Sequence, residues 1–114
     1  MEEMRRAGHE VIGICADGEL LEPVRNAGFR VETLPLTRSF NPVRVMGSVV
    51  GLFKLFRRGH FDMVHVHTPA AAFVGRLAAR FAGVPCIVYT AHGFYFHEYM
   101  PLPKRWLVIA MEWL

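Results

Sequence analysis

The sequence contains no long hydrophobic run. Although 53% of its 114 residues are hydrophobic, no apolar stretch reaches the roughly 18 residues that a membrane-spanning helix needs. The first ten residues, MEEMRRAGHE, are charged and lack the apolar centre of a signal peptide. We therefore expect a cytoplasmic protein with a packed globular core, and the length allows one domain or part of one.

Cysteine is scarce as well. Cys15 and Cys86 are the only two, and they form neither a disulfide framework nor a zinc-binding pattern. Both lie in runs that we predict to be buried strands, where cysteine serves as a small apolar side chain. The sequence therefore predicts two core cysteines.

Acidic residues are missing from the middle of the chain. None occurs between Glu32 and Asp62, where the sequence places Arg38, Arg44, Lys54, Arg57 and Arg58. Residues 1–32 carry seven acids and four bases, whereas residues 33–114 carry three acids and nine bases. This asymmetry suggests an anionic partner such as a phosphate, a lipid headgroup or a nucleic acid, although many charge runs are only solvated faces.

The sequence does contain a pattern that recurs four times: a basic or helical segment, a glycine, and then a β-rich run. The four copies read RRAGHEVIGIC, RNAGFRVETLP, RRGHFDMVHVH and RFAGVPCIVYT. A glycine just past a helix end accepts the left-handed conformation that closes the helix. We assign this role to Gly8, Gly28, Gly59 and Gly83.

The pattern predicts helices that alternate with strands. We expect strands at 10–16, 30–34, 63–67 and 85–90, and helices at 1–7, 19–27, 42–58, 70–82 and 104–114. Repeated helix–glycine–strand units are typical of α/β folds. The expected architecture is a parallel sheet with helices on both faces.

Two of these helices have clear start signals. Asn41 before Pro42, and Thr68 before Pro69, each place a capping side chain next to a first-turn proline. In the helix at 70–82 we expect an apolar stripe, a row of small residues that lets the helix lie close to the sheet, and outward-facing bases. These are, respectively, Phe73, Leu77 and Phe81; Ala71, Gly75, Ala78 and Ala82; and Arg76 and Arg80.

The helix at 42–58 has two interpretations. It is apolar almost all round, with its bases at the C-terminal end, which suits a buried crossover helix whose last-turn cations complement the helix dipole. Alternatively, Phe53 and Phe56 enter a lipid surface. The protein would then be peripheral at the inner face of the plasma membrane, where anionic headgroups would bind Lys54, Arg57 and Arg58.

Three groups of polar residues follow the predicted strands. Ligands of parallel α/β sheets bind beyond the carboxyl ends of the strands, so these groups are candidates for a binding site. They are Asp17-Gly18, the run His65-Val66-His67-Thr68-Pro69, and the run from Thr90 to His97.

His67 and Thr68 stand where the helix at 70–82 begins. The free N–H groups and positive dipole end of a helix favour an anion or a sugar oxygen; in the alternative, Thr68 only caps the helix and a backbone carbonyl holds His67. His92 precedes Gly93, which frees the backbone to approach a ligand. This histidine can donate to a sugar hydroxyl or a phosphate, or move a proton, or it can simply lock its own loop.

The aromatic residues after His92 either stack on a sugar or a lipid chain, or form the core beneath a loop. These rings belong to Phe94, Tyr95, Phe96 and Tyr99. His65 and His67 alternate onto one face of a strand, and with His92 they could supply three metal ligands. Because the spacing is loose and no carboxylate is nearby, we expect no metal site.

Together these residues resemble a known family. The segments AGHEV, FDMVHVHTPAAAFVGRLAARFAGVPCIVYTAHGFYF and PKRWLVIAMEWL are similar to the N-terminal domain of family-4 retaining glycosyltransferases of the GT-B fold. The similarity is strongest to bacterial enzymes that build capsular polysaccharides and exopolysaccharides. Residues 61–114 carry most of it, and the pieces H-x-H-T-P…G-R-L-A-A-R and T-A-H-G-F-x-F are specific only in combination.

The resemblance implies an enzyme of two Rossmann-like domains that moves a sugar from a nucleotide-sugar donor to a lipid-linked or polysaccharide acceptor with retention. The N-terminal domain would face the acceptor, and His92 would be the catalytic residue beside the transferred sugar. The nucleotide sugar is a substrate, and neither a cofactor, a metal nor a nucleic acid is expected. The implied substrate-binding residues are His67, Thr68, Thr90, Gly93, Phe94 and Tyr95.

Parts of the family pattern have no counterpart in this sequence. These are the first, central strand with its glycine-rich loop, and the whole C-terminal donor domain with its paired glutamates. We therefore expect residues 1–114 to be an incomplete N-terminal half of a GT-B fold, inactive alone, with a gap between the strands at 10–16 and 63–67. Two alternatives stay open: a non-catalytic membrane-surface binding module, and a histidine-based metal hydrolase, which would need a longer barrel and further ligands.

Overall fold

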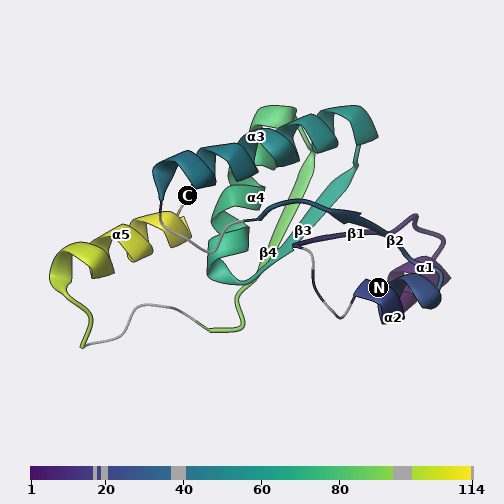
Figure 1. The fold of residues 1–114 in the computed structure, drawn as a ribbon, viewed down its shortest axis with the longest axis horizontal. Helices are drawn as coiled ribbons and strands as arrows, with labels where there is room; N and C mark the ends of the chain where they lie inside the picture. Colours follow the sequence, from purple (N-terminus) through teal and green to yellow (C-terminus); the bar gives the residue numbers. More distant parts are fainter. Residues whose placement is uncertain (17, 19–20, 37–40, 94–98, 114) are drawn as a thin grey trace. The chain divides into compact units, whose positions relative to one another are not determined.

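The computed structural model describes residues 1–16, 18, 21–36, 41–93 and 99–113. The chain forms two compact units, Met1–Leu36 and Thr37–Leu114, and each has its own pair of strands. Helices and strands alternate along the described residues, as the recurring glycine pattern predicts (Figure 1).

The first unit contains α1 (Glu2–Arg6), β1 (Ile12–Cys15), α2 (Leu21–Asn26) and β2 (Arg30–Thr33). β1 and β2 are parallel, with Ile12 opposite Arg30. The Arg5 guanidinium lies 4.4 Å from the ring centroid of Phe29 and donates to the carbonyl oxygen of Ala27 at 3.3 Å. This cation–π contact holds α1 against the turn before β2. It thereby adds to the stability of a two-stranded sheet whose strands are only four residues long.

The second unit contains α3 (Pro42–Gly59), β3 (Met63–His67), α4 (Pro69–Ala82), β4 (Cys86–Thr90) and α5 (Leu102–Trp113). β3 and β4 are parallel, with Met63 opposite Cys86 and His67 opposite Thr90. α4 connects these strands and packs against both of them, and α3 packs on α4 (Figure 1). The unit is therefore a β3–α4–β4 crossover whose helix also contacts α3 and α5.

The predicted elements are confirmed: all four strands and all five helices form, with ends within two residues of those expected. The α/β class with parallel strands is confirmed as well. The described strands form two sheets, β1–β2 and β3–β4, and no hydrogen-bonded ladder of described residues joins β1 to β3. Cys15 and Cys86 are free thiols that are half-buried, not fully buried as expected.

α4 lies very close to β3. A Cβ on Gly75 would sit 2.6 Å from Cγ1 of Val66, so the helix approaches the strand at a distance that only glycine permits. The predicted row of small residues is confirmed, because Gly75 and Ala78 are buried. Phe81, predicted to belong to an apolar stripe, is instead 67% exposed. The face of α4 that packs on the sheet is therefore the one whose small residues let the helix backbone come close to β3, and not the one with the largest apolar side chains.

Arg76 does not face outward as predicted. Its guanidinium donates to the carbonyl oxygens of Met111 at 2.7 Å and Glu112 at 3.1 Å, at the C-terminal end of α5. It also lies 4.8 Å from the ring centroid of Tyr89, whose hydroxyl donates to Glu112 at 3.3 Å. The last carbonyls of a helix have no partner within the helix. Arg76 therefore caps α5 and holds it beside β4.

The two ends of α3 compare differently with the prediction. Asn41 caps the first turn as expected, because its side-chain oxygen accepts from the N–H groups of Val43 at 3.0 Å and Arg44 at 3.4 Å. At the other end the helix continues through Gly59, and His60 takes the left-handed conformation with φ 48° and ψ 49°. A Cβ on Gly59 would overlap the Phe61 ring. This glycine therefore serves close packing, and the left-handed backbone falls on a histidine, at a cost of about 1–2 kcal/mol.

α3 is buried on one face only. The residues that it buries are Ser48, Val49, Leu52 and Phe56. Phe56 is 3% exposed and meets the Phe61 ring edge-on, with ring centroids 5.9 Å apart. The alternative interpretation, in which Phe56 enters a lipid surface, is therefore wrong, and this residue belongs to the core as in a buried helix. None of the described helices combines the length and hydropathy needed to cross a bilayer.

We expect Gly75→Ala to destabilise the protein even though alanine is the better helix former. Alanine in a helix interior is favoured over glycine by about 0.5–1 kcal/mol, whereas overpacking against a stiff β-branched neighbour costs about 1–3 kcal/mol. The net loss in the free energy of unfolding should be about 1 kcal/mol, measured by urea denaturation.

Gly47→Ala is the matched control. Gly47 lies inside α3, and no described residue beyond the neighbouring backbone of the helix lies within 4 Å of the position that its Cβ would take. This substitution should raise the free energy of unfolding by about 0.5–1 kcal/mol. Equal gains for the two substitutions would contradict the close approach of α4 to β3.

Candidate functional site

The carboxyl ends of β3 and β4 bring the described members of the predicted site together. Because the strands are parallel and His67 is opposite Thr90, the segments that follow both strands begin at the same edge of the sheet. His67 and Thr68 come from β3 and the turn after it, and Thr90 and His92 come from β4 and its loop. This is the edge at which ligands of parallel α/β sheets bind.

The side chains at this edge form two hydrogen bonds. His65 Nε2 and Thr90 Oγ1 are 2.7 Å apart, and His67 Nδ1 and His92 Nε2 are 3.3 Å apart. The rings also contact one another: the centroids of His65 and His67 are 4.2 Å apart, and those of His67 and His92 are 5.5 Å apart and stacked. We call His65, His67, Thr90 and His92 the histidine cluster.

Strand alternation explains why the histidine cluster is accessible. Val64 is buried, and the Val66 side chain lies against Gly75 of α4. Because successive side chains of a strand point to opposite faces, His65 and His67 point away from α4. Both imidazoles are exposed, as is His92, while Thr90 is half-buried. The ring nitrogens of the cluster can therefore donate to, or accept from, a bound ligand.

Thr68 does not cap α4 with its side chain. Its φ of 65° and ψ of 138° are unusual for a β-branched residue, and its hydroxyl makes no capping hydrogen bond. The capping interpretation is therefore wrong for this side chain. A strained conformation of this kind persists only where the surrounding structure enforces it, and such residues gather at functional sites.

The loop after β4 is described as far as Gly93. Gly93 has a φ of 154°, which residues with a side chain rarely adopt, and none of the described residues beyond its chain neighbours lies within 4 Å of where its Cβ would be. The role of Gly93 in letting the backbone approach a ligand stays a prediction. Tyr99 is 87% exposed, so it is not a core residue. The predicted site residues Phe94 and Tyr95, together with Phe96, His97 and Asp17, lie outside the described residues.

The histidine cluster disfavours a positive charge on His67. Partial burial lowers the pKa of His67 below its ordinary value of 6.5, and repulsion from His65 and then from His92 lowers it further. The lowered pKa of His67 favours its neutral form, and a neutral imidazole suits hydrogen bonding to sugar hydroxyls because it offers one donor and one acceptor. No three His, Cys, Asp or Glu side chains among the described residues are arranged to hold a metal ion, so the three-histidine ligand set is not formed.

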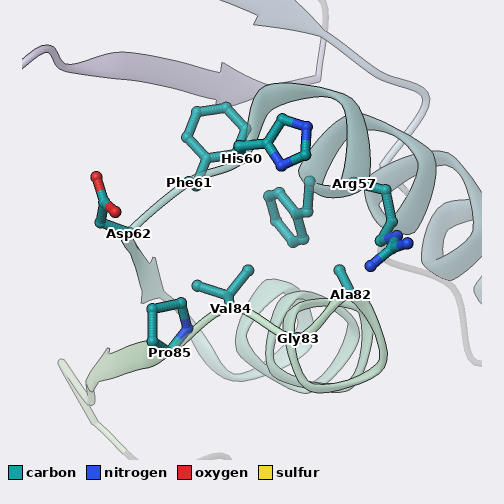
Figure 2. Close-up of a pocket in the computed structure, with 9 residues that line it drawn as sticks. Arg57, His60, Phe61, Asp62, Ala82, Gly83, Val84 and Pro85 are labelled. Carbon is teal, nitrogen blue, oxygen red and sulfur yellow. The ribbon is translucent and has the colours of Figure 1, made fainter.

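A small pocket lies at the other end of the crossover. It has a volume of about 260 Å³, below the range of about 300–1,000 Å³ typical of small-molecule sites. Figure 2 shows His60, Asp62 and Arg57 around it, where α3 and α4 end and β3 and β4 begin. Its remaining walls are formed by Phe56, Phe61, Ala82, Gly83, Val84 and Pro85. The pocket is not part of the predicted site, and no motif in the sequence marks it.

Sequence reasoning missed the role of His65. The sequence places this residue in a candidate binding run and in a possible metal-ligand set, whereas the structure pairs it with the Thr90 hydroxyl. The H-x-H alternation was a usable signal, because it places both imidazoles on one face of β3. The pairing itself requires the register of β3 on β4, which one sequence does not display.

Comparison with known proteins connects this geometry to a family. A family model described as "Glycosyl transferase 4-like domain" matches residues 1–114. An Escherichia coli protein named "UDP-Gal:alpha-D-GlcNAc-diphosphoundecaprenol alpha-1,3-galactosyltransferase" is 36% identical over 89% of this chain. EpsD from Bacillus subtilis, described as a glycosyltransferase, is 35% identical over 96% of it. The chain spans only 26% and 29% of the length of these two relatives.

A solved structure shares the fold. The crystal structure of a glycosyltransferase from Rickettsia africae matches 86% of this chain with a TM-score of 0.72 and 20% sequence identity. The matched part is 25% of that protein. The likeness confirms the predicted α/β fold as that of a segment of a glycosyltransferase.

The lowered pKa of His67 predicts how stability depends on pH. The unfolded chain binds a proton near pH 6.5, the ordinary value, and folded His67 binds it only at lower pH. The free energy of unfolding should therefore be constant above about pH 7, fall as the pH drops through 6.5, and level off once folded His67 is protonated. Urea denaturation at a series of pH values measures this.

His67→Gln should reduce the fall in stability at acidic pH, since glutamine does not titrate. The matched control is His60→Asn, which removes an exposed histidine at the opposite end of β3 and keeps a residue that tolerates a left-handed backbone. The control should retain the fall. An undiminished fall in His67→Gln would show that His67 is not its source.

Proposed function

This chain belongs to the family of glycosyl transferase 4-like domains, and we propose that it is part of an enzyme that transfers a sugar from a nucleotide-sugar donor, with retention, to a lipid-linked or polysaccharide acceptor. The observation that carries the proposal is the exposed histidine cluster at the carboxyl ends of β3 and β4. It offers hydrogen-bonding groups at the edge where ligands of such folds bind.

The donor and acceptor classes are proposed from the named relatives. The Escherichia coli relative uses UDP-Gal and a sugar carried on diphosphoundecaprenol, and it makes an α-1,3 linkage. An α product from an α-configured donor corresponds to retention. For this chain we propose a nucleotide sugar as donor and a sugar on a lipid diphosphate as acceptor. The donor is a substrate, so the proposal needs no resident cofactor.

Each site residue has a proposed role. His92 contacts the transferred sugar from the acceptor side, and Gly93 lets the backbone approach it. His67, Thr68 and Thr90 bind substrate hydroxyls or phosphate oxygens beside it, and the rings of Phe94 and Tyr95 stack on the sugar or its lipid. Stabilisation of the departing nucleotide diphosphate is electrostatic. We propose that this stabilisation comes from parts of the enzyme beyond residues 1–114, so these residues do not transfer sugar by themselves.

α3 supports a further proposed contact, with an anionic membrane surface. Val43, Met46 and Val50 are 78%, 59% and 41% exposed, and their spacing places them on one side of the helix. Lys54 and Arg57 continue that spacing and are exposed too. An apolar row that ends in bases is typical of a helix that lies on anionic lipid. This contact would place the cytoplasmic enzyme at the inner face of the plasma membrane, beside its lipid-linked acceptor.

In the complete protein, His92→Ala should lower the rate of sugar transfer by about 10²-fold or more, because one hydrogen bond made at the reacting sugar is lost. The measurement is transfer of radiolabelled galactose from UDP-Gal to a synthetic GlcNAc-diphosphate lipid. The same assay is then repeated with other nucleotide sugars as donors. His60→Asn should retain the rate within about twofold, since the residue lies at the other end of β3.

Two results would contradict these assignments separately. Unchanged transfer in His92→Ala would remove this residue from the catalytic site while leaving the activity in place. Absence of transfer by the unsubstituted protein with every nucleotide sugar and lipid acceptor tried would overturn the proposed function.

The membrane contact predicts a charge-dependent affinity for vesicles. Each base near an anionic surface contributes about 1 kcal/mol, so replacing Lys54, Arg57 and Arg58 by glutamine should weaken binding by about 10²-fold. Flotation with phosphatidylglycerol vesicles measures this, and pure phosphatidylcholine vesicles should not bind. A charge-matched control replaces Arg6, Arg80 and Lys104. Equal weakening by the control would show that net charge alone, and not α3, governs binding.

A further inference from the structure

The two hydrogen bonds of the histidine cluster follow one geometric rule. In the register of the sheet, His65 is opposite Val88 and His67 is opposite Thr90. Each histidine nevertheless bonds to the residue two positions further along the second chain segment: His65 to Thr90, and His67 to His92. Residues two apart on a strand lie on the same face. The two bonds are therefore parallel diagonal ties on one face of the β3–β4 pair.

Among the described residues, these two side-chain hydrogen bonds hold the start of the loop after β4. Ala91, His92 and Gly93 are exposed, and outside the helices and strands no backbone hydrogen bond between described residues involves 91–93. Gly93 adds conformational freedom at its φ of 154°. The position of the His92 ring therefore depends on its side-chain bond to His67 and on the Thr90 bond one step earlier.

We propose that His65 and His67 are positioning residues, which hold Thr90 and His92 at the place where the sugar reacts. This inference rests on the glycosyl transfer proposed above, and it gives a role to His65, which that proposal leaves unused. For His67, positioning His92 accompanies its proposed contact with substrate.

Imidazole suits this positioning because each bond couples the tautomer of the histidine to the donor or acceptor role of its partner. In the His67–His92 bond, one of the two facing nitrogens carries a hydrogen and the other accepts it. Because His92 uses its Nε2 in this bond, its Nδ1 is left to face a ligand, and the tautomer determines whether that Nδ1 donates or accepts. The same logic applies to His65, whose Nε2 meets the Thr90 hydroxyl, a group that both donates and accepts. Losing either histidine removes this orientation without removing Thr90 or His92.

A double-mutant cycle on kcat in the complete protein tests the action of His67 through His92. His67→Ala should lower kcat by about tenfold, and His67→Ala combined with His92→Ala should equal His92→Ala alone within about twofold. The proposed direct contact of His67 with substrate would appear in KM instead. Losses in kcat that multiply would overturn the positioning role of His67.

Conservative variants provide the second readout. His67→Asn places an amide close to the position of Nδ1 and should recover part of the kcat that His67→Ala loses. Thr90→Ser keeps the hydroxyl and should retain the effect of His65→Ala, whereas Thr90→Val removes the hydroxyl and should abolish it. An effect of His65→Ala that is the same in Thr90→Val would overturn the positioning role of His65.

A spectroscopic measurement separates this inference from the proposed function. In the complete protein labelled with ¹⁵N in its imidazole rings, His67→Ala should shift the Nε2 resonance of His92, and His60→Asn should leave it unchanged. A shift in a protein that transfers no sugar would support the hydrogen-bonded pairing while overturning the proposed function. Sugar transfer without a shift would overturn the pairing while leaving the proposed function intact.

Discussion

The register of β4 on β3 is the constraint on which the rest of the site depends. It places His67 opposite Thr90, so the turn into α4 and the loop after β4 leave the sheet side by side. A shift of one residue would turn every side chain of one strand to the other face. His65 and His67 would then point toward α4, and Val64 and Val66 would be exposed. The contact between Val66 and Gly75 prevents this, because no imidazole fits where the helix lies so close.

Most of the fold could be predicted from the sequence because its signals are local. A helix, a glycine and an apolar β-rich run recur, and each element that they predict is present. The misassignments concern side-chain contacts that local periodicity and capping patterns do not display. Arg76 sits at an outward position of α4 by local periodicity, yet the carbonyls of α5, 35 and 36 residues further on, turn it inward. Gly59 matches the capping pattern, but the Phe61 ring occupies the place where a Cβ of residue 59 would lie. The left-handed conformation falls on His60 instead.

The location of the candidate site could be predicted from the sequence, but the hydrogen bonds between its side chains could not. Strand ends and a glycine after His92 indicate where a ligand binds in this class of fold, and the structure assembles His67, Thr68, Thr90 and His92 there. The diagonal hydrogen bonds could not be predicted, because each depends both on the register of β4 on β3 and on the rotamers of the two side chains. The sequence therefore predicts that His65 lies near the binding edge, but it does not predict that the partner of this residue is the Thr90 hydroxyl.

The partner of His67 also bears on the type of chemistry. A histidine that acts as a general base is commonly oriented by a carboxylate, which stabilises its charged form. His67 instead faces two imidazoles, and its pKa is lowered by partial burial first and then by repulsion from His65 and His92. Such a histidine is poorly suited to accept and keep a proton, but well suited to hydrogen-bond neutral hydroxyls. The proposed retaining transfer would proceed by displacement on one face of the sugar, and the departing diphosphate could take the acceptor proton. Such a reaction would require orientation from its surroundings and not a strong base.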